Sequence, residues 1–247
     1  MKIKPKIGLK IGSVLYKGPG KVDAKVIEII SKDPDFIFNK KYLDKFNKGL
    51  KRKDLSMHTQ TRRVFTEKDK GLRKMEILIL KSEVLACEYL KCKELIVHLT
   101  QEKLKKPEII QFKEIISFAK KHGVEVLYEP NGKLIGKNFL YNLSQLKGLN
   151  VNLDIGHLNT AIVNKTLGMN VENFLKMVKN KVVYLHLHNN EGEDNHQGLN
   201  EGSLDWKNIL DQLNMGKVRK IMSEVHDYQK MAGEVKLVKK YFRGRKK

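Results

Sequence analysis

The chain alternates short apolar runs with segments of helical periodicity, and this alternation restricts its fold more than any other feature. Eight runs of strand type occur along the 247 residues, mostly without the apolar–polar alternation of a half-exposed strand. Unalternated runs are expected where both faces of a parallel strand are covered. The runs are Lys6–Ile11, Asp35–Phe38, Asp54–His58, Glu94–Leu99, Val124–Glu129, Asn150–Asp154, Val182–His188 and Lys220–Glu224.

The segments between these runs show the periodicity of amphipathic helices. We expect helices at Glu67–Cys92, Ile109–His122, Val171–Val178, Trp206–Leu213 and Tyr228–Phe242. Gly123 and Asp205 suit the end of one helix and the start of another. Eight strand–helix units are the number that closes a parallel sheet, and the length is usual for one such barrel. The sequence therefore predicts an α/β fold, a single-domain (β/α)₈ TIM barrel over residues 1–247.

The chain is strongly basic, with 49 Lys and Arg against 28 Asp and Glu and a net charge of +21. Such an excess attracts polyanions, and nucleic acid is the obvious candidate, although a solvated lysine-rich surface explains the charge equally well. Basic residues in loops after two of the predicted strands are candidate DNA phosphate contacts. They are Arg62, Arg63, Lys103, Lys105 and Lys106.

The cysteines and the apolar segments indicate a cytoplasmic protein. Cys87 and Cys92 lie five residues apart in a predicted helix, which fits neither a disulfide framework nor a CxxC metal clip. The N-terminus has no apolar signal region, and no apolar run reaches the roughly 18 residues that span a bilayer. We therefore expect no membrane association, and the sequence gives no sign of an obligate protein partner.

Ionisable residues end most of the predicted strands. In a barrel these ends converge on one mouth, where active sites of this fold form. Any one of them alone suits a hydrogen-bonded rim residue, but together they combine imidazoles with carboxylates, the ligands of zinc and similar cations. Carboxylates buried together without a cation would repel one another. The sequence therefore predicts a metal site that includes His58, His98, Glu129, Asp154, His186 and Glu224.

Further residues enlarge this set. His157 follows Asp154 closely, and Asp194 and His196 lie in the glycine-containing loop after the seventh strand. The remaining histidines are interpreted as structural or solvent-exposed. They are His122, His188 and His226.

At these positions the sequence resembles the endonuclease IV family of apurinic/apyrimidinic endonucleases, within the wider xylose-isomerase-like barrel superfamily. The resemblance runs from His58 onward and includes a D-x-H run at Asp194 ahead of a turn at Asn200-Glu201-Gly202. It implies three zinc ions held by nine side chains. The first ion would bind His58, His98 and a bridging Glu129, the second Glu129, Asp154, His186 and Glu224, and the third His157, Asp194 and His196.

The same resemblance implies cleavage of the phosphodiester bond 5′ to abasic sites in double-stranded DNA, leaving a 3′-hydroxyl, in base excision repair. Clustered zinc ions supply a nucleophile at neutral pH and neutralise phosphoryl charge. The catalytic carboxylates would be Glu129, which bridges two ions, and Glu224, which also orients the nucleophile. The family's motif on the first strand is absent, and the loop Thr59-Gln60-Thr61-Arg62-Arg63 lacks its aromatic wedge.

Two other functions fit parts of the pattern. A sugar or sugar-phosphate isomerase or epimerase would use one Mn²⁺ or similar cation. Its ligands would be Glu129, Asp154, His186 and Glu224. A non-catalytic nucleic-acid-binding barrel would keep the metal for structure. Residues that a one-metal epimerase does not need favour the nuclease, and these are His58, His98, Asp194 and His196.

Overall fold

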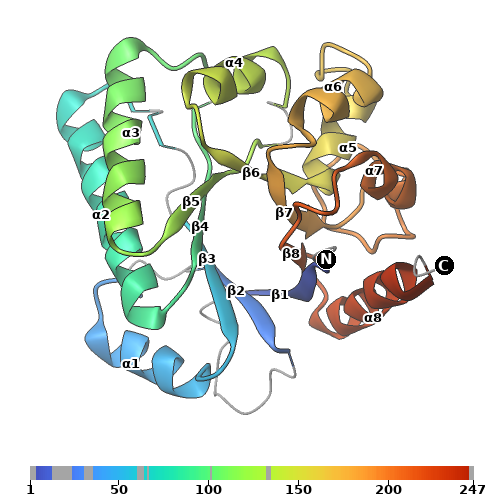
Figure 1. Ribbon diagram of the computed structural model, residues 1–247, viewed down its shortest axis with the longest axis horizontal. Helices are drawn as coiled ribbons and strands as arrows, with labels where there is room; N and C mark the ends of the chain where they lie inside the picture. Colours follow the sequence, from blue (N-terminus) through green and yellow to red (C-terminus); the bar gives the residue numbers. More distant parts are fainter. Residues whose placement is uncertain are drawn as a thin grey trace. The chain divides into compact units, whose positions relative to one another are not determined.

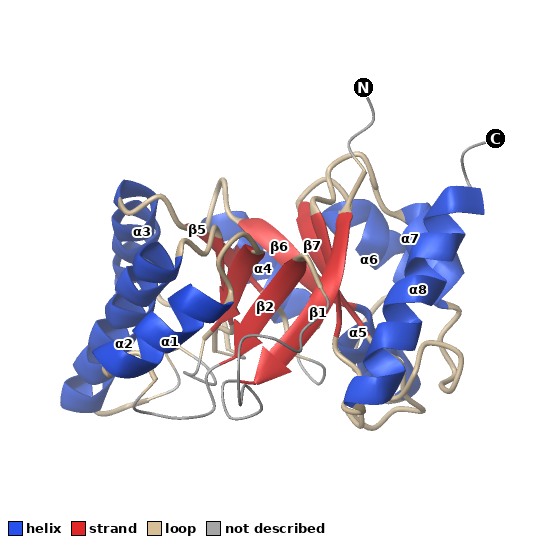
Figure 2. Ribbon diagram, turned by 90° about the horizontal axis from the view of Figure 1, so that it is seen from below, coloured by secondary structure: helices blue, strands red, loops and turns tan. Residues whose placement is uncertain are grey.

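The fold is a (β/α)₈ TIM barrel, as the sequence predicts. The computed structural model describes residues 4–12, 24–30, 36–59, 64–65, 67–100, 102–131 and 135–244. Its strands follow one another in chain order around a closed parallel barrel, and helices alternate with them (Figures 1 and 2). The strands are β1 (Lys6–Gly12), β2 (Val26–Ile30), β3 (Asp54–His58), β4 (Glu94–Val97), β5 (Glu125–Tyr128), β6 (Asn150–Asp154), β7 (Val182–Leu187) and β8 (Lys220–Ser223). The helices are α1 (Lys40–Gly49), α2 (Lys70–Leu90), α3 (Lys106–Lys121), α4 (Lys137–Gln145), α5 (Ile155–Val163), α6 (Val171–Val178), α7 (Trp206–Gln212) and α8 (Tyr228–Gly244).

The predicted second strand is wrong. Residues 36–38 of Asp35–Phe38 form a turn before α1, Asp35 lies outside the described residues, and the strand is Val26–Ile30 instead. A carboxylate at Glu28 interrupts the apolar run, which hid this strand from the sequence pattern. Inside the barrel, Glu28 is fully buried with Lys10 Nζ 3.5 Å from its Oε1. The other predicted strands are confirmed, with ends shifted by one or two residues at most.

The chain forms two compact units. Unit 2 comprises residues 10–129 and 141–149. In it β2, β3, β4 and β5 pair in parallel, and the register that sets Val97 beside Tyr128 brings the following residues, His98 and Glu129, to one level. Its core includes fully buried Leu95 and Phe112. Each such side chain contributes about 1.5–3 kcal/mol through burial.

Unit 1 comprises residues 1–9, 130–140 and 150–247. In it β6 pairs with β7, and β8 pairs with both β7 and β1. The register places Asp154 beside His186 at the carboxyl ends of β6 and β7. Helix α5 begins directly after β6, because the Asp154 side chain accepts a hydrogen bond from the backbone N–H of His157 and so caps the helix. The strand end and the helix start are thereby fixed together.

Helix ends follow ordinary capping rules. Asp69 caps α2, Asn170 caps α6 and Asp205 caps α7, each by accepting backbone N–H bonds with its side chain. Gly123 has φ of +70° after α3, which agrees with its predicted place at a helix end. Among the described residues, no helix is long and apolar enough to cross a membrane.

Candidate metal centre

In unit 2, His58, His98 and Glu129 form a buried cluster at the carboxyl ends of β3, β4 and β5. The Nε2 atom of His58 lies 3.3 Å from Oε2 of Glu129, and Nε2 of His98 lies 3.7 Å from Oε1. The two imidazole rings are 4.9 Å apart, and all three residues are less than 9 % exposed. Both imidazoles therefore point one nitrogen at the same carboxylate.

The opposite ring nitrogens of this cluster are held by backbone carbonyls. His58 Nδ1 donates to Thr59 O at 3.0 Å, and His98 Nδ1 donates to Glu129 O at 3.0 Å. Because a carbonyl oxygen only accepts, each Nδ1 carries a proton, and Nε2 is the ring nitrogen that faces the Glu129 carboxylate. This is how metal-binding histidines are oriented in proteins.

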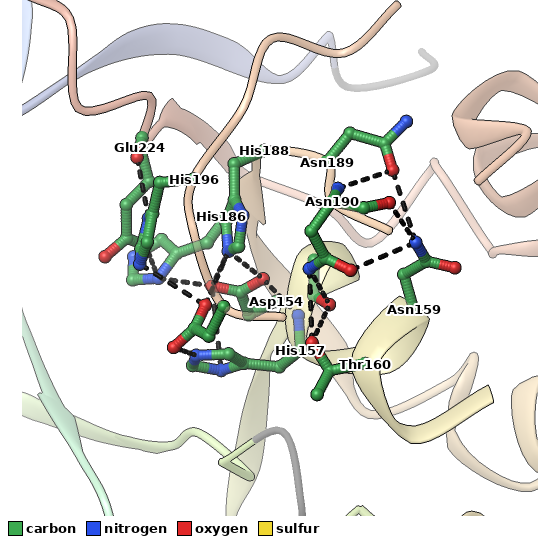
Figure 3. A network of polar contacts seen from close by, with 12 residues as sticks. Asp154, His157, Asn159, Thr160, His186, His188, Asn189, Asn190, His196 and Glu224 are labelled. Atoms are coloured by element: carbon green, nitrogen blue, oxygen red, sulfur yellow. Dashed lines mark hydrogen bonds and ion pairs between the residues drawn. The ribbon is translucent and has the colours of Figure 1, made fainter. Parts of the chain in front are cut away.

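In unit 1, Asp154 lies among three histidines (Figure 3). Nε2 of His188 is 3.0 Å from Asp154 Oδ1, Nδ1 of His157 is 3.7 Å from Oδ2, and Nδ1 of His186 is 3.8 Å from Oδ2. All four residues are at most 5 % exposed. The same Nδ1 atom of His186 lies 2.8 Å from Oε2 of Glu224.

The loop after β7 completes this group with Asp194 and His196. Asp194 is 3.3 Å from His157 Nε2, 3.4 Å from His196 Nε2 and 3.8 Å from His188 Nε2. His196 Nδ1 donates to Glu224 O at 2.8 Å, which leaves Nε2 for a ligand. The His188 and His196 rings are stacked with centroids 4.0 Å apart.

The pKa values in unit 1 follow from burial opposed by close ion pairs. Burial alone would raise the pKa of Asp154, but His157 and His188 outweigh it and bring the pKa to about 2. Burial lowers the pKa of His188, but Asp154 more than reverses this and leaves it raised. The pKa of His196 is lowered, first by burial and then by His188. Asp154 is thus ionised at neutral pH, which is the form that binds a cation.

An asparagine network fixes the loop that carries Asp194 and His196. Asn159 on α5 donates to Asn190 O at 2.6 Å, and Asn190 donates to Gly156 O at 2.8 Å (Figure 3). Asn189 donates to Leu199 O and Leu204 O across the same loop. All three asparagines are nearly fully buried, so the loop is held by internal hydrogen bonds rather than by solvent.

The structure brings the nine predicted ligands into these two clusters, His58, His98 and Glu129 in unit 2 and the other six in unit 1. It adds His188, which the sequence analysis interpreted as structural or exposed. The sequence His186-Leu187-His188 could have indicated this ligand, because side chains two residues apart in a strand point to the same side. His122 is half-buried and contacts Glu88 Oε2 at 3.0 Å, whereas His226 is exposed.

The candidate DNA contacts are placed only in part. Arg62 and Arg63 lie outside the described residues. Lys103, Lys105 and Lys106 are exposed at the start of α3, and Lys103 lies over the Tyr141 ring at 5.1 Å. Their contact with DNA stays a prediction.

The donor sets suit zinc or a similar divalent cation. Four ligands bound at about 2.0–2.1 Å in a tetrahedron lie about 3.3 Å apart. The separations of 3.3 and 3.7 Å in unit 2, and of 3.0 to 3.8 Å in unit 1, are close to that value. In unit 2, one ion fits among His58, His98 and Glu129. In unit 1, two groups of three could each hold an ion, and they share His188. The first is Asp154, His157 and His188, and the second is His188, Asp194 and His196.

One protein family matches most of the chain. The family described as xylose isomerase-like TIM barrel matches residues 21–239. A curated relative, the uncharacterized protein MJ1614 of Methanocaldococcus jannaschii, is 37% identical over 78 residues, which span 31% of this chain and 27% of that protein.

Solved structures show the same fold at low sequence identity. A D-tagatose 3-epimerase-like protein superposes with a TM-score of 0.77 at 16% identity, covering 96% of this chain and 97% of its own. The TTHB071 protein of Thermus thermophilus, soaked with ZnCl₂, gives 0.73 at 15% identity over 98% and 100%. The IOLI protein with a bound zinc atom gives 0.70 at 17% identity over 96% of each chain.

Proposed function

The chain belongs to the xylose isomerase-like TIM barrel family, and on that premise we propose that it is a metal-dependent phosphodiesterase that cleaves DNA 5′ to abasic sites. The observation that carries the proposal is the cluster of His58, His98 and Glu129. Its two imidazoles are buried, fixed at Nδ1 by backbone carbonyls and directed at one carboxylate through Nε2. A one-metal isomerase would use Glu129 but has no need of these two histidines as ligands.

Bound zinc would supply the Lewis acidity that neutralises phosphoryl charge and lowers the pKa of water. Residues of the chain would bind the substrate and orient the attacking water. Glu224 is 14% exposed at its side chain, whereas Asp154 and Glu129 are at most 1% exposed, so of these three carboxylates Glu224 is best able to contact a substrate or orient a water. Both candidate ligands in the loop after β7 reach solvent, with side chains 45% exposed at Asp194 and 12% exposed at His196.

Charge supports an anionic substrate. The net charge of +21 favours encounter with a polyanion, and the exposed lysines Lys103, Lys105 and Lys106 suit contacts to phosphates. An abasic nucleotide has lost its stacking and pairing, so turning it out of the duplex costs less than for an intact one. Selection of abasic sites therefore needs no base-reading side chain.

A sugar or sugar-phosphate isomerase or epimerase is the second candidate. The observation in its favour is the similarity to a D-tagatose 3-epimerase-like protein over nearly the whole chain. In that case one divalent cation would use Glu129, Asp154, His186 and Glu224, and the carboxylates would move a proton on the substrate. His58 and His98 would then have no role in the chemistry.

Two measurements on the same purified protein separate these functions. Metal analysis should find three zinc ions per chain for the nuclease and one ion for the isomerase. A duplex oligonucleotide with a single abasic-site analogue should be cut on the 5′ side of the analogue, with binding that weakens steeply as salt rises. Metal-loaded protein that leaves the duplex intact but converts a keto-sugar would overturn the proposal.

A further inference from the structure

Helix α2 carries exposed apolar side chains on its outer face. Its inner face is buried through residues such as Leu80 and Val84, as expected for a barrel helix. The outer face nevertheless exposes Leu78 by 61 % and Met75 by 56 %. Large apolar side chains on α2 that remain exposed are Leu72, Met75, Leu78, Leu85 and Tyr89. An extended apolar face of this kind marks an interaction surface.

The outer face of α2 has the spacing of a helix-pairing seam. Steps of three and four residues connect its members, which repeat every seven residues. This outer stripe consists of Met75, Leu78, Ser82, Leu85 and Tyr89. Such a seam fits the ridge of another helix more closely than it fits an irregular loop.

The neighbours of α2 leave the outer stripe open. Arg73 of α2 pairs with Glu108 of α3 at 3.3 Å, and Tyr89 donates a hydrogen bond to Asp44 of α1. Figure 1 shows α2 and α3 side by side in unit 2. Both neighbours therefore flank α2. Within the stripe, Tyr89 contacts α1 but stays 39 % exposed, and Met75, Leu78 and Leu85 are each at least 45 % exposed.

We propose that the outer stripe is a dimer interface, on which α2 pairs antiparallel with α2 of a second copy of this chain. In the two-fold register that stacks Met75 on Leu85 of the second copy, Leu78 meets Ser82 of the second copy. Lys74 then lies beside Glu88 of the second copy, on the flank of the seam. A parallel pairing would instead set Lys74 against an apolar side chain and leave both charges unpaired.

The charge of α2 itself permits this approach. The helix holds four basic and three acidic residues, whereas the whole chain carries a net charge of +21. Two copies that meet along α2 therefore bring together two helices with a net charge of +1 each, which repel one another only weakly.

A stable dimer needs the surfaces of α1 and α3 beside that of α2. A helix of 21 residues is about 30 Å long. An interface needs about 800 Å² on each partner. Along the length of α2, this area corresponds to a strip about 25 Å wide. Helices pack about 8–10 Å apart, so α2 with one neighbour on each side provides that width. The neighbours contribute exposed Tyr42 on α1 and Ile110 on α3.

Sedimentation equilibrium or light scattering of the purified, metal-loaded chain tests the proposal. At tens of micromolar, the wild type should have twice the monomer mass of 28.6 kDa. Leu78→Glu should be monomeric with an unchanged circular dichroism spectrum. Met177→Glu, an equally exposed apolar residue on α6, should remain dimeric. A monomeric wild type, or a dimer that survives Leu78→Glu, would overturn the proposal.

A charge exchange tests the register. Lys74→Glu should raise the dimer dissociation constant about tenfold, because two carboxylates would then face each other. Adding Glu88→Lys to that variant should restore the dimer. Since Glu88 also contacts His122, thermal melts of both variants control for damage within the unit. A folded double variant that stays monomeric would reject the antiparallel register.

Discussion

The Nε2 atom of His188 lies 3.0 Å from Oδ1 of Asp154, and both side chains are completely buried. His188 also lies 3.8 Å from Asp194, so it links the strand ends to the loop after β7. We expect His188→Ala to lower the zinc content of the protein, since it removes a ligand and leaves Asp154 with fewer partners. Metal analysis after dialysis measures this. The control is His122→Ala, whose histidine lies outside the clusters, and an unchanged zinc content in His188→Ala would contradict the assignment.

The pH dependence of the metal-free protein follows from the same pair. The folded-state pKa of His188 is raised above the unfolded value of about 6.5, so its stabilisation is present below that pH and is lost as the pH rises through the folded pKa. The pKa of Asp154 is lowered to about 2, so its stabilisation is present above about pH 3.9 and is lost as the pH falls toward 2. Together these groups predict maximal stability between about pH 4 and 6.5.

Urea unfolding in the presence of a chelator checks this dependence. His188→Gln should flatten the decline in the free energy of unfolding on the alkaline side, and it should also weaken the acid-side dependence, because His188 helps to lower the pKa of Asp154. Without chelator, added zinc should also flatten the decline in the free energy of unfolding at alkaline pH, because the cation takes the place of the proton on His188. An alkaline decline that is the same in wild type and His188→Gln would show that another group causes it.

The sequence predicted the architecture well because the strand–helix alternation depends on local apolar patterns. It failed at β2, where Glu28 breaks the pattern and only the barrel supplies its partner Lys10. It also left out His188, because membership of the cluster depends on Asp154, 34 residues away in sequence. Local patterns reveal strand ends, but which side chains meet there is decided by register and loop packing.

Gly156 tests how closely His188 is packed. A Cβ atom at position 156 would lie 2.0 Å from Cε1 of the His188 ring, which cannot move away without leaving Asp154. We expect Gly156→Ala to destabilise the protein by about 1–3 kcal/mol and to lower its zinc content. The control is Gly233→Ala in α8, where a Cβ meets nothing within 4 Å and should stabilise the helix by about 1 kcal/mol. Equal melting temperatures for the two variants would show that the ring is free to shift.

Metal removal should destabilise the folded protein as a whole. A cation that binds only the folded state adds about 4 kcal/mol at a free concentration of 1,000 times its dissociation constant. Calorimetric melts with and without chelator measure the effect. Because the ligands of unit 2 come from three separate strands, His58→Ala should show a smaller loss on chelation than the wild type. Equal melting temperatures with and without chelator would exclude tight metal binding by either cluster.

The nuclease and the isomerase differ most sharply at His98. Its Nδ1–H is held by Glu129 O at 3.0 Å, and its Nε2 faces the Glu129 carboxylate. His98→Ala removes a ligand that only the multi-metal chemistry needs, so cleavage of an abasic-site duplex should fall by at least about 100-fold. Conversion of a keto-sugar by a single-metal site would be nearly unchanged. Thr59→Ala is the matched control, because the Thr59 carbonyl that holds His58 remains. Full cleavage by His98→Ala would remove the main support for the nuclease, whereas loss of cleavage with a normal circular dichroism spectrum would show that this histidine serves the chemistry rather than the fold.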